Sequence, residues 1–192
     1  ATMKHPAIVK FIGWAVTPKN RGNIYLIQAE KGSLDRVIKS CRDGNPDPLW
    51  DDTHKFIISY GVAVAMKYLH SYKIIHRDLK CENILIDSNL YPYVTDFGTS
   101  KGENDVHTSQ TVTQTSAKIM PPEFLDSYEK YNRKPYIDVY SYAIIVFEIL
   151  QGLEIINGIE LSKRLYKQKR PKINDTVSSS YRQLIEQCWS QD

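Results

Sequence analysis

The stretch from Ile74 to Gly98 constrains the fold of this chain most, because short apolar runs alternate there with charged and amide side chains. The apolar runs predict three short strands, at Ile74–Ile75, Ile84–Ile86 and Tyr93–Val94. The cluster Asp87-Ser88-Asn89 predicts a turn that joins the last two strands. Polar side chains therefore follow strand ends, and we expect them to face one cleft.

These polar side chains are of the types that phosphoryl transfer needs: a carboxylate near the acceptor, a cation near the phosphate, and oxygen ligands for magnesium. They are His76, Arg77, Asp78, Lys80, Asn83 and, after the turn, Asp96. Taken singly, His-Arg-Asp is explained by a charged turn, and Asp-Phe-Gly by chance in a hairpin. Together, and at these spacings, they resemble the catalytic loop and the metal-binding loop of eukaryotic protein kinases.

The resemblance implies transfer of phosphate from ATP, with Mg²⁺, to Ser or Thr hydroxyls of proteins. Asp78 would accept the hydrogen bond of the substrate hydroxyl, and Lys80 would offset charge on the γ-phosphate. Asn83 and Asp96 would bind Mg²⁺ through oxygen. Leu85 would lie under the adenine, although a core strand position explains it equally well. The implied catalytic residues are thus Asp78, Lys80 and Asn83, and the implied cofactor-binding residues are Lys80, Asn83, Leu85 and Asp96.

The same resemblance implies an α+β, protein kinase-like fold over residues 1–192, as a partial kinase domain. Residues 1–31 would form a remnant of the small lobe and the connector, and residues 32–192 a mainly helical large lobe. β-branched runs at Ala7–Trp14 and Asn23–Ile27 predict the last two strands of the small lobe as a hairpin. The connector after them is about two residues shorter than usual in the family, which bears on the adenine contacts.

Helical patterns occupy much of the remaining chain. Ser33 is expected to cap a helix over Leu34–Ser40, and Asp51 or Asp52 to cap a second one. Tyr181–Trp189 predicts a final amphipathic helix. In the second helix, an apolar stripe with a four-residue spacing predicts the face that packs on the core: Phe56, Tyr60, Val64 and Tyr68, with Ile57 and Leu69 beside them.

The segment Tyr136–Leu150 is almost entirely apolar, which predicts a helix buried on all sides. By resemblance, Asp138 would anchor the catalytic loop from this helix through backbone amides. An N-cap role for Asp138 is the plainer alternative. The side chains of Phe97, His76 and Phe11 would stack as the regulatory column of the family.

Composition limits the other possibilities. The 192 residues carry 24% charged residues and a formal net charge of +3, which does not favour nucleic acid or an anionic membrane as main partner. Cys41, Cys81 and Cys188 lack disulfide or zinc spacing, so we expect reduced thiols and a cytoplasmic location. The longest apolar run, Ala143–Leu150, is too short to span a bilayer. Oligomeric state, and membrane attachment through segments outside this chain, are left open.

Two expectations concern parts beyond the catalytic stretch. Thr99–Ser116 predicts a mobile loop in which Arg77 would pair with a phosphorylated Thr108, Ser109, Thr111 or Thr113; a merely solvated loop is an equal alternative. Lys163–Arg170 predicts a solvated basic face. Because the chain contains no glycine-rich loop and no strand lysine, opens without Met and stops within a helical pattern, we expect a fragment with incomplete activity. A pseudokinase or scaffold that binds proteins is the alternative.

Overall fold

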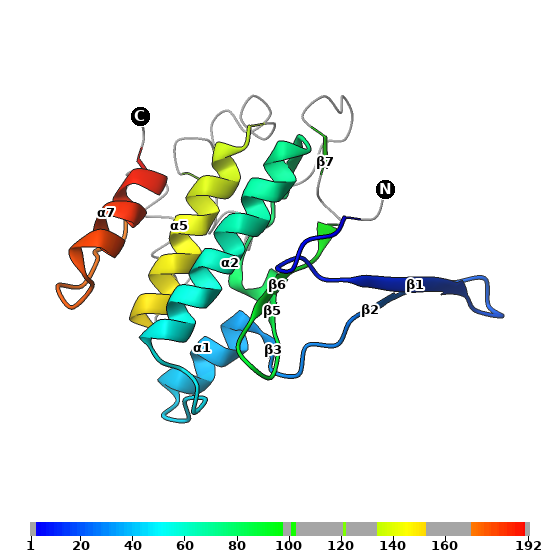
Figure 1. Cartoon of the computed structure of the whole chain (residues 1–192), viewed down its shortest axis with the longest axis horizontal. Helices are drawn as coiled ribbons and strands as arrows, with labels where there is room; N and C mark the ends of the chain where they lie inside the picture. Colours follow the sequence, from blue (N-terminus) through cyan, green and yellow to red (C-terminus); the bar gives the residue numbers. More distant parts are fainter. Residues whose placement is uncertain (1–2, 98–100, 103–120, 122–133, 153–169, 191–192) are drawn as a thin grey trace.

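The computed structural model describes residues 3–97, 101–102, 121, 134–152 and 170–190 and has an α+β architecture (Figure 1). The long helices α2 (Asp52–Ser71) and α5 (Tyr136–Gln151) pack side by side. Helix α7 (Ser179–Cys188) packs against α5, and α1 (Leu34–Arg42) lies at the end of the helical layer near the small sheets. The strands lie on the other side of α2, which agrees with the predicted fold class.

The strands form small antiparallel sheets. The first pairs β1 (Phe11–Val16) with β2 (Gly22–Leu26), the second has the order β3 (Gly32–Ser33), β5 (Ile84–Ile86), β6 (Pro92–Val94), and the third pairs β4 (Ile74–Ile75) with β7 (Lys101–Gly102). Strands β4, β5 and β6 confirm the three predicted from Ile74 onwards. The turn between β5 and β6 is also confirmed, because the Asp87 carboxylate accepts the backbone N–H groups of Asn89 and Tyr91, both at 2.9 Å.

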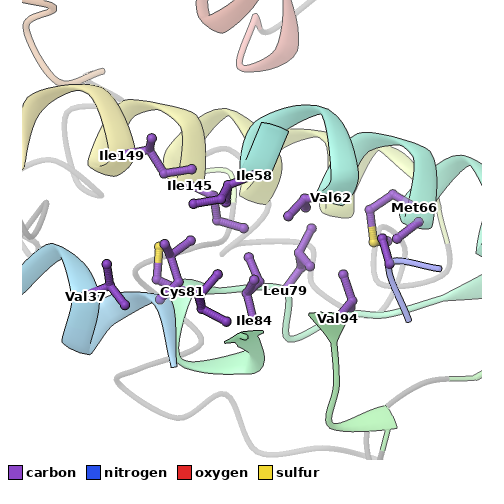
Figure 2. Close-up of a cluster of buried hydrophobic side chains, with 14 of the residues drawn as sticks. Val37, Ile58, Val62, Met66, Leu79, Cys81, Ile84, Val94, Ile145 and Ile149 are labelled. Atoms are coloured by element: carbon purple, nitrogen blue, oxygen red, sulfur yellow. The ribbon is translucent and has the colours of Figure 1, made fainter. Parts of the chain in front are cut away.

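The main hydrophobic core lies between α2, α5 and the segment from Leu79 to Val94 (Figure 2). Ile58 and Val62 of α2 meet Ile145 and Ile149 of α5 there. The opposite side of α5 enters a second cluster with α7, so the prediction of a helix buried on all sides is confirmed from Tyr140 onwards. In the first turn, Tyr136 and Val139 are exposed. Each fully buried Ile or Leu of this kind contributes about 1.5–3 kcal/mol.

The predicted core stripe of α2 is wrong at Phe56 and Tyr60, whereas Leu69 is fully buried and Tyr68 packs against the core. Phe56 and Tyr60 are 56% and 59% exposed and stack on each other, with ring centroids 5.9 Å apart. The buried face consists instead of Ile58, Val62, Ala65, Met66 and Leu69, with Ser59 and Gly61. Both stripes have helical spacing, and the second one includes Gly61, where a Cβ would lie only 2.5 Å from Cγ of Pro92. The absence of a side chain at Gly61 lets β6 approach the helix, which decides which face is buried.

The helix starts are partly as predicted. Asp51 is the N-cap of α2, since its carboxylate accepts the N–H of His54 at 2.8 Å. Ser33 occupies the N-cap position of α1 but makes no side-chain capping hydrogen bond. Helix α1 continues to Arg42, two residues beyond the predicted end at Ser40.

The first predicted strand, Ala7–Trp14, is wrong at its start, because the hairpin begins only at Phe11. Ala7, Ile8 and Val9 are buried and bridge to β6 instead. The N–H of Val9 donates to Val94 O and the N–H of Val94 to Ala7 O, both at 2.9 Å. Ala7 and Ile8, which had predicted a longer strand, therefore pack in the main core. The hairpin beyond them projects away from the helices (Figure 1).

Candidate functional site

The candidate site is built on the loop between β4 and the 3₁₀ helix η1 (Cys81–Asn83). Leu79 is fully buried and Cys81 is 2% exposed, and both belong to the main core. Their burial anchors the loop from below, and Asp78 and Lys80, which alternate with them, remain partly exposed. The local sequence thus separates anchoring side chains from polar ones.

The carboxylate of Asp78 is held by two neighbours on the same oxygen. Lys80 Nζ lies 2.7 Å from Asp78 Oδ2, and Asn83 Nδ2 donates to the same atom at 3.0 Å. Asn83 Nδ2 also donates to the backbone O of Asp78 at 2.7 Å. The side chains of Lys80 and Asp78 are only 17% and 14% exposed, so their charge–charge attraction is screened less than that of a surface pair. This arrangement fixes the orientation of the carboxylate.

The second predicted loop reaches the first through His76 and Thr95. The fully buried His76 ring lies with Nε2 2.9 Å from the carbonyl O of Thr95, which can only accept, so Nε2 carries the proton. The N–H of Thr95 donates to the carbonyl of Asn83 at 2.9 Å. Asp96 follows directly, with a left-handed φ of 61°. The chain therefore brings Asp96 next to the strand that begins at the end of η1.

The aromatic column is confirmed in part. The ring centroids of His76 and Phe97 are 5.4 Å apart. Phe11 lines the same cavity as Phe97 but is 45% exposed, and its place in the stack stays a prediction.

Asp138 anchors the catalytic loop from α5, as predicted. Its side chain is completely buried and accepts the backbone N–H groups of His76 and Arg77, both at 2.9 Å. The N-cap of α5 is Pro135, so the alternative N-cap role is wrong. Arg77 has a left-handed φ of 69°. Such a conformation costs a non-glycine residue about 1–3 kcal/mol, and the hydrogen bond to Asp138 offsets part of that cost.

Leu85 lies in β5 between Ile84 and Ile86, which are both fully buried. Because side chains alternate along a strand, Leu85 faces away from the main core, and it is only partly buried. This placement favours the predicted cleft-facing position over the core alternative.

Cys81 lies within the site but is unsuited to nucleophilic chemistry. Burial raises the pKa of its thiol well above the usual value, and the nearby charge of Glu148 raises this pKa further. The thiol is therefore neutral at physiological pH, and it serves as a core side chain. All three cysteines are free, as expected.

A cavity of about 990 Å³ lies between the N-terminal segment, the β1–β2 hairpin and the segment Thr95–Phe97. Its lining is mostly apolar and includes Ile8, Phe11 and Leu26. Of the predicted site residues it contains only Asp96. The cavity thus lies next to the candidate site, and its lining does not indicate where a nucleotide binds.

Within the described ranges, no group of three or more His, Cys, Asp or Glu side chains could hold a metal ion. This does not conflict with the predicted magnesium pair, which uses one amide and one carboxylate and leaves further positions to water and phosphate. The helices that the structure describes include none long and apolar enough to cross a membrane. Several predicted residues lie outside the described residues: Gly98, the loop candidates Thr108, Ser109, Thr111 and Thr113, and the basic run up to Lys169.

Comparison with known proteins establishes the class. The family model of the protein kinase domain matches residues 1–192, the whole chain. The chain therefore belongs to the protein kinase domain family, as its catalytic-loop and metal-binding-loop motifs had indicated.

Three relatives illustrate the match: two are named probable serine/threonine-protein kinases, and one is named a mitogen-activated protein kinase kinase kinase. A probable serine/threonine-protein kinase of Dictyostelium discoideum is 30% identical, with coverage of 100% of this chain and 14% of the relative. A probable serine/threonine-protein kinase of Arabidopsis thaliana is 31% identical, with coverage of 99% of this chain and 18% of the relative. Mitogen-activated protein kinase kinase kinase 12 of Rattus norvegicus is 32% identical, with coverage of 98% of this chain and 20% of the relative. The chain thus spans at most a fifth of the length of these relatives.

Two contributors to the site were missed from the sequence. His70, in the last turn of α2, places Nε2 2.8 Å from Asp138 Oδ2. Thr95 links the two loops through its backbone N–H and C=O, which no side-chain motif could reveal. From the sequence, His70 is a basic residue near a helix C-terminus, and this position predicts an interaction with the helix dipole. It does not predict a contact with a residue 68 positions further along the chain.

Proposed function

We propose that this chain carries the large-lobe machinery of a protein kinase that transfers the γ-phosphoryl group of ATP to Ser or Thr hydroxyls of proteins. The observation that carries the proposal is the shared fixation of Asp78 Oδ2 by Lys80 and Asn83, 2.7 and 3.0 Å away. A carboxylate held in one orientation suits a group that must meet an acceptor hydroxyl in a defined geometry.

In this proposal Asp78 accepts the proton of the attacking hydroxyl as that oxygen bonds to phosphorus. A positioned base of this kind contributes about 10²- to 10⁴-fold in rate. Lys80 stabilises the negative charge on the transferred phosphoryl group, and its ion pair with Asp78 keeps it within reach of that charge. Leu85 provides an apolar surface for the adenine ring.

Asn83 and Asp96 would hold Mg²⁺, and the donor set fits this ion. The amide nitrogen of Asn83 is committed to Asp78, which leaves its oxygen as the atom that can bind a cation. Asp96 is exposed and offers a carboxylate, and both are hard oxygen ligands. When bound, the ion would neutralise charge on the phosphates of ATP.

The finer assignments are also proposals. His5-Pro6-Ala7-Ile8-Val9, Gly32-Ser33-Leu34 and Cys188-Trp189 resemble the tyrosine-kinase-like group of serine/threonine kinases. The chain divides into residues 1–31 and 32–192, which the separate β1–β2 sheet supports, although Ala7 and Ile8 pack in the main core. Free thiols at all three cysteines support a cytoplasmic location. Protein substrates and ATP are the proposed partners.

The test uses the full-length protein with its upstream residues. Asp78→Asn removes the base and keeps the size of the side chain, so we expect phosphate transfer from ATP to a generic Ser/Thr substrate to fall by about 10²-fold or more. Asp52→Asn, at a side chain that is 98% exposed, is the matched control and should leave the rate unchanged. Equal rates for Asp78→Asn and wild type would show that Asp78 is not the base.

A further inference from the structure

The connector between β2 and β3, residues 27–31, is attached to two later loops by the side chains of neighbouring residues. The carboxylate of Glu30 accepts the backbone N–H of Ser88 at 3.0 Å. Nζ of Lys31 lies 2.6 Å from Oδ2 of Asp47. Ser88 belongs to the turn between β5 and β6, and Asp47 belongs to the loop between α1 and α2. Two adjacent side chains of the connector therefore reach two separate parts of the fold.

Both partners of the connector are held by hydrogen bonds of their own. The other carboxylate oxygen of Asp47 accepts the N–H of Leu49 at 3.0 Å, and the Asp47 side chain is only 13% exposed. Ser88 follows Asp87 in a turn that the N–H of Leu90 closes by donating to the Asp87 carbonyl at 3.1 Å. A contact costs less conformational entropy when one of its partners is already ordered. The connector is thus bonded to two ordered points.

The attached end of the connector lies beside the strand that carries Leu85. The N–H of Lys31 donates to the carbonyl of Ile86 at 3.0 Å, and Ser33 of β3 pairs with Leu85 of β5. Leu85 is the residue proposed above to provide an apolar surface for the adenine ring. The position of the connector therefore determines which groups lie next to that surface, at the edge of the proposed nucleotide site.

An ordinary explanation is that these are two surface contacts that contribute little to stability. Lys31 is 37% exposed, which agrees with a small contribution of its ion pair to folding. A positional role does not need a large contribution to folding. A single attachment would let the connector pivot, whereas two attachments from neighbouring residues to separate loops oppose that pivot. The arrangement of the two contacts therefore favours a role in positioning.

We propose that Glu30 and Lys31 are positioning residues for nucleotide binding, which together hold the connector in place beside Leu85. This inference rests on the proposed function. It predicts that loss of the two contacts raises KM for ATP and leaves kcat nearly unchanged. The reason is that both contacts run to loops outside the segment that carries Asp78, so the group proposed to act as the base keeps its own surroundings.

The test measures phosphate transfer from ATP by the full-length protein after each contact is removed from either side. Glu30→Ala removes the acceptor, and Ser88→Pro removes the N–H donor at the second position of the turn, where proline is favoured. Lys31→Met and Asp47→Asn each remove one charge of the ion pair. We expect KM for ATP to rise roughly 3- to 10-fold when Glu30→Ala and Lys31→Met are combined, with kcat within about twofold of wild type.

The two partners of one contact should not act additively. Glu30→Ala and Ser88→Pro should each raise KM for ATP, and their combination should raise it no further than either one alone. If Ser88→Pro does not fold, Lys31→Met with Asp47→Asn provides the same comparison for the ion pair. Additive effects within both pairs would show that the contacts are not the cause and would overturn the inference.

The matched controls change one acidic and one basic side chain away from the connector. Glu186→Ala, in α7, and Lys172→Met, before α7, are at exposed positions, and both variants should keep wild-type KM for ATP. Unchanged KM in the combined Glu30→Ala and Lys31→Met variant would overturn the inference. A fall in kcat at unchanged KM would also overturn it, because the residues would then act on the chemical step.

Hydrogen exchange gives a readout that does not depend on activity. In the combined Glu30→Ala and Lys31→Met variant, the amides of Lys31's position and of Ser88 should exchange faster than in wild type. The amides of residues 58–69 in α2 should keep their protection. A loss of protection across α2 would mean that the two residues only stabilise the fold, and would overturn the positioning role.

The two readouts separate this inference from the proposed function. A wild-type protein that transfers no phosphate, with faster exchange of the two amides in the combined variant alone, would refute the kinase activity and support the attachment of the connector. An active wild type, with unchanged exchange and unchanged KM in the combined variant, would refute the role of the attachment and leave the activity standing.

Discussion

Asp138 and His76 are 62 residues apart in the chain, yet the Asp138 carboxylate accepts the backbone N–H of His76 at 2.9 Å. The acceptor belongs to a helix that supplies side chains to both hydrophobic clusters, and the donor begins the loop that carries Asp78. A helix buried in both hydrophobic clusters is thus bonded directly to the segment proposed to perform the chemistry. The first prediction tests this hydrogen bond.

Asp138→Asn should lower both stability and phosphate transfer. An amide keeps one acceptor oxygen but places an NH₂ group against the remaining donors, in a site with no exposure to water. We expect the free energy of unfolding to fall by about 2–4 kcal/mol. Urea denaturation measures the loss. Asp175→Asn, at a side chain that is 93% exposed, serves as control, and an equal effect at the two positions would contradict the prediction.

Gly61→Ala tests the close approach of α2 and β6. A Cβ at position 61 would lie 2.5 Å from Cγ of Pro92, which is much closer than van der Waals contact. Overpacking of this kind costs about 1–3 kcal/mol, against a gain of about 1 kcal/mol from helix propensity. We therefore expect a net loss of stability in thermal or urea denaturation. Gly22→Ala, where nothing lies within 4 Å of the added carbon, should change stability by less, and a stabilising Gly61→Ala would show that β6 can move away.

The 192 residues should be prone to aggregation when they are produced alone, because of the exposed β1–β2 hairpin. Trp14 and Ile24 face each other across the hairpin and are each 71% exposed, and Ile12 beside them is 59% exposed. Exposed apolar strands of this kind associate with other chains. The double substitution Trp14→Thr and Ile24→Thr should reduce light scattering on heating. The control, Phe56→Gln with Tyr60→Gln, removes two exposed aromatic side chains from a helix instead and should reduce light scattering less. A monomeric, cooperative melt of the unsubstituted 192 residues would refute the expectation.

The ion pair between Lys31 and Asp47 should make stability depend on pH in the acid range. The two charged atoms are 2.6 Å apart, and the hydrogen bond from Lys31 lowers the pKa of Asp47 below its usual 3.8, with help from the backbone N–H of Leu49. Because the folded-state pKa is the lower one, the stabilisation is complete above the unfolded pKa and is lost as pH falls through the folded pKa. Lys31 is 37% exposed, which limits the contribution to about 0.5–1 kcal/mol.

Asp47→Asn removes this contribution, so its stability should fall below that of wild type at pH 7. The difference should shrink as the pH is lowered from 5 towards 3, in urea titrations at each pH. Asp43→Asn, at an exposed position, provides the matched control. A constant difference between Asp47→Asn and wild type over this range would show that the charge of Asp47 is not the cause.

The catalytic stretch was predictable because its information is local. Strands β4, β5 and β6 and the turn at Asp87 follow from apolar runs bounded by turn residues, and the positions of Asp78, Lys80 and Asn83 follow from their spacing along one loop. The family resemblance added the anchoring of this loop by Asp138, which composition and periodicity alone could not supply. The buried helix α5 was predictable because almost every residue in it is apolar, so no choice of face was needed.

The sequence by itself determined the class of protein, the order of its helices and of strands β1, β2, β4, β5 and β6, and the residues proposed for chemistry, since these depend on residue type and spacing. The short strands β3 and β7 were not predicted, and β7 falls within the segment Thr99–Ser116 that was expected to be a mobile loop. Only the tertiary structure decided which face of α2 is buried, where Ala7–Val9 pack and which side chain completes the coordination of Asp138. Those outcomes depend on contacts between segments far apart in the chain, such as Gly61 with Pro92 and His70 with Asp138. Periodicity alone is equally compatible with either face of a helix, and the choice falls to the face whose neighbours can approach closely enough to exclude water.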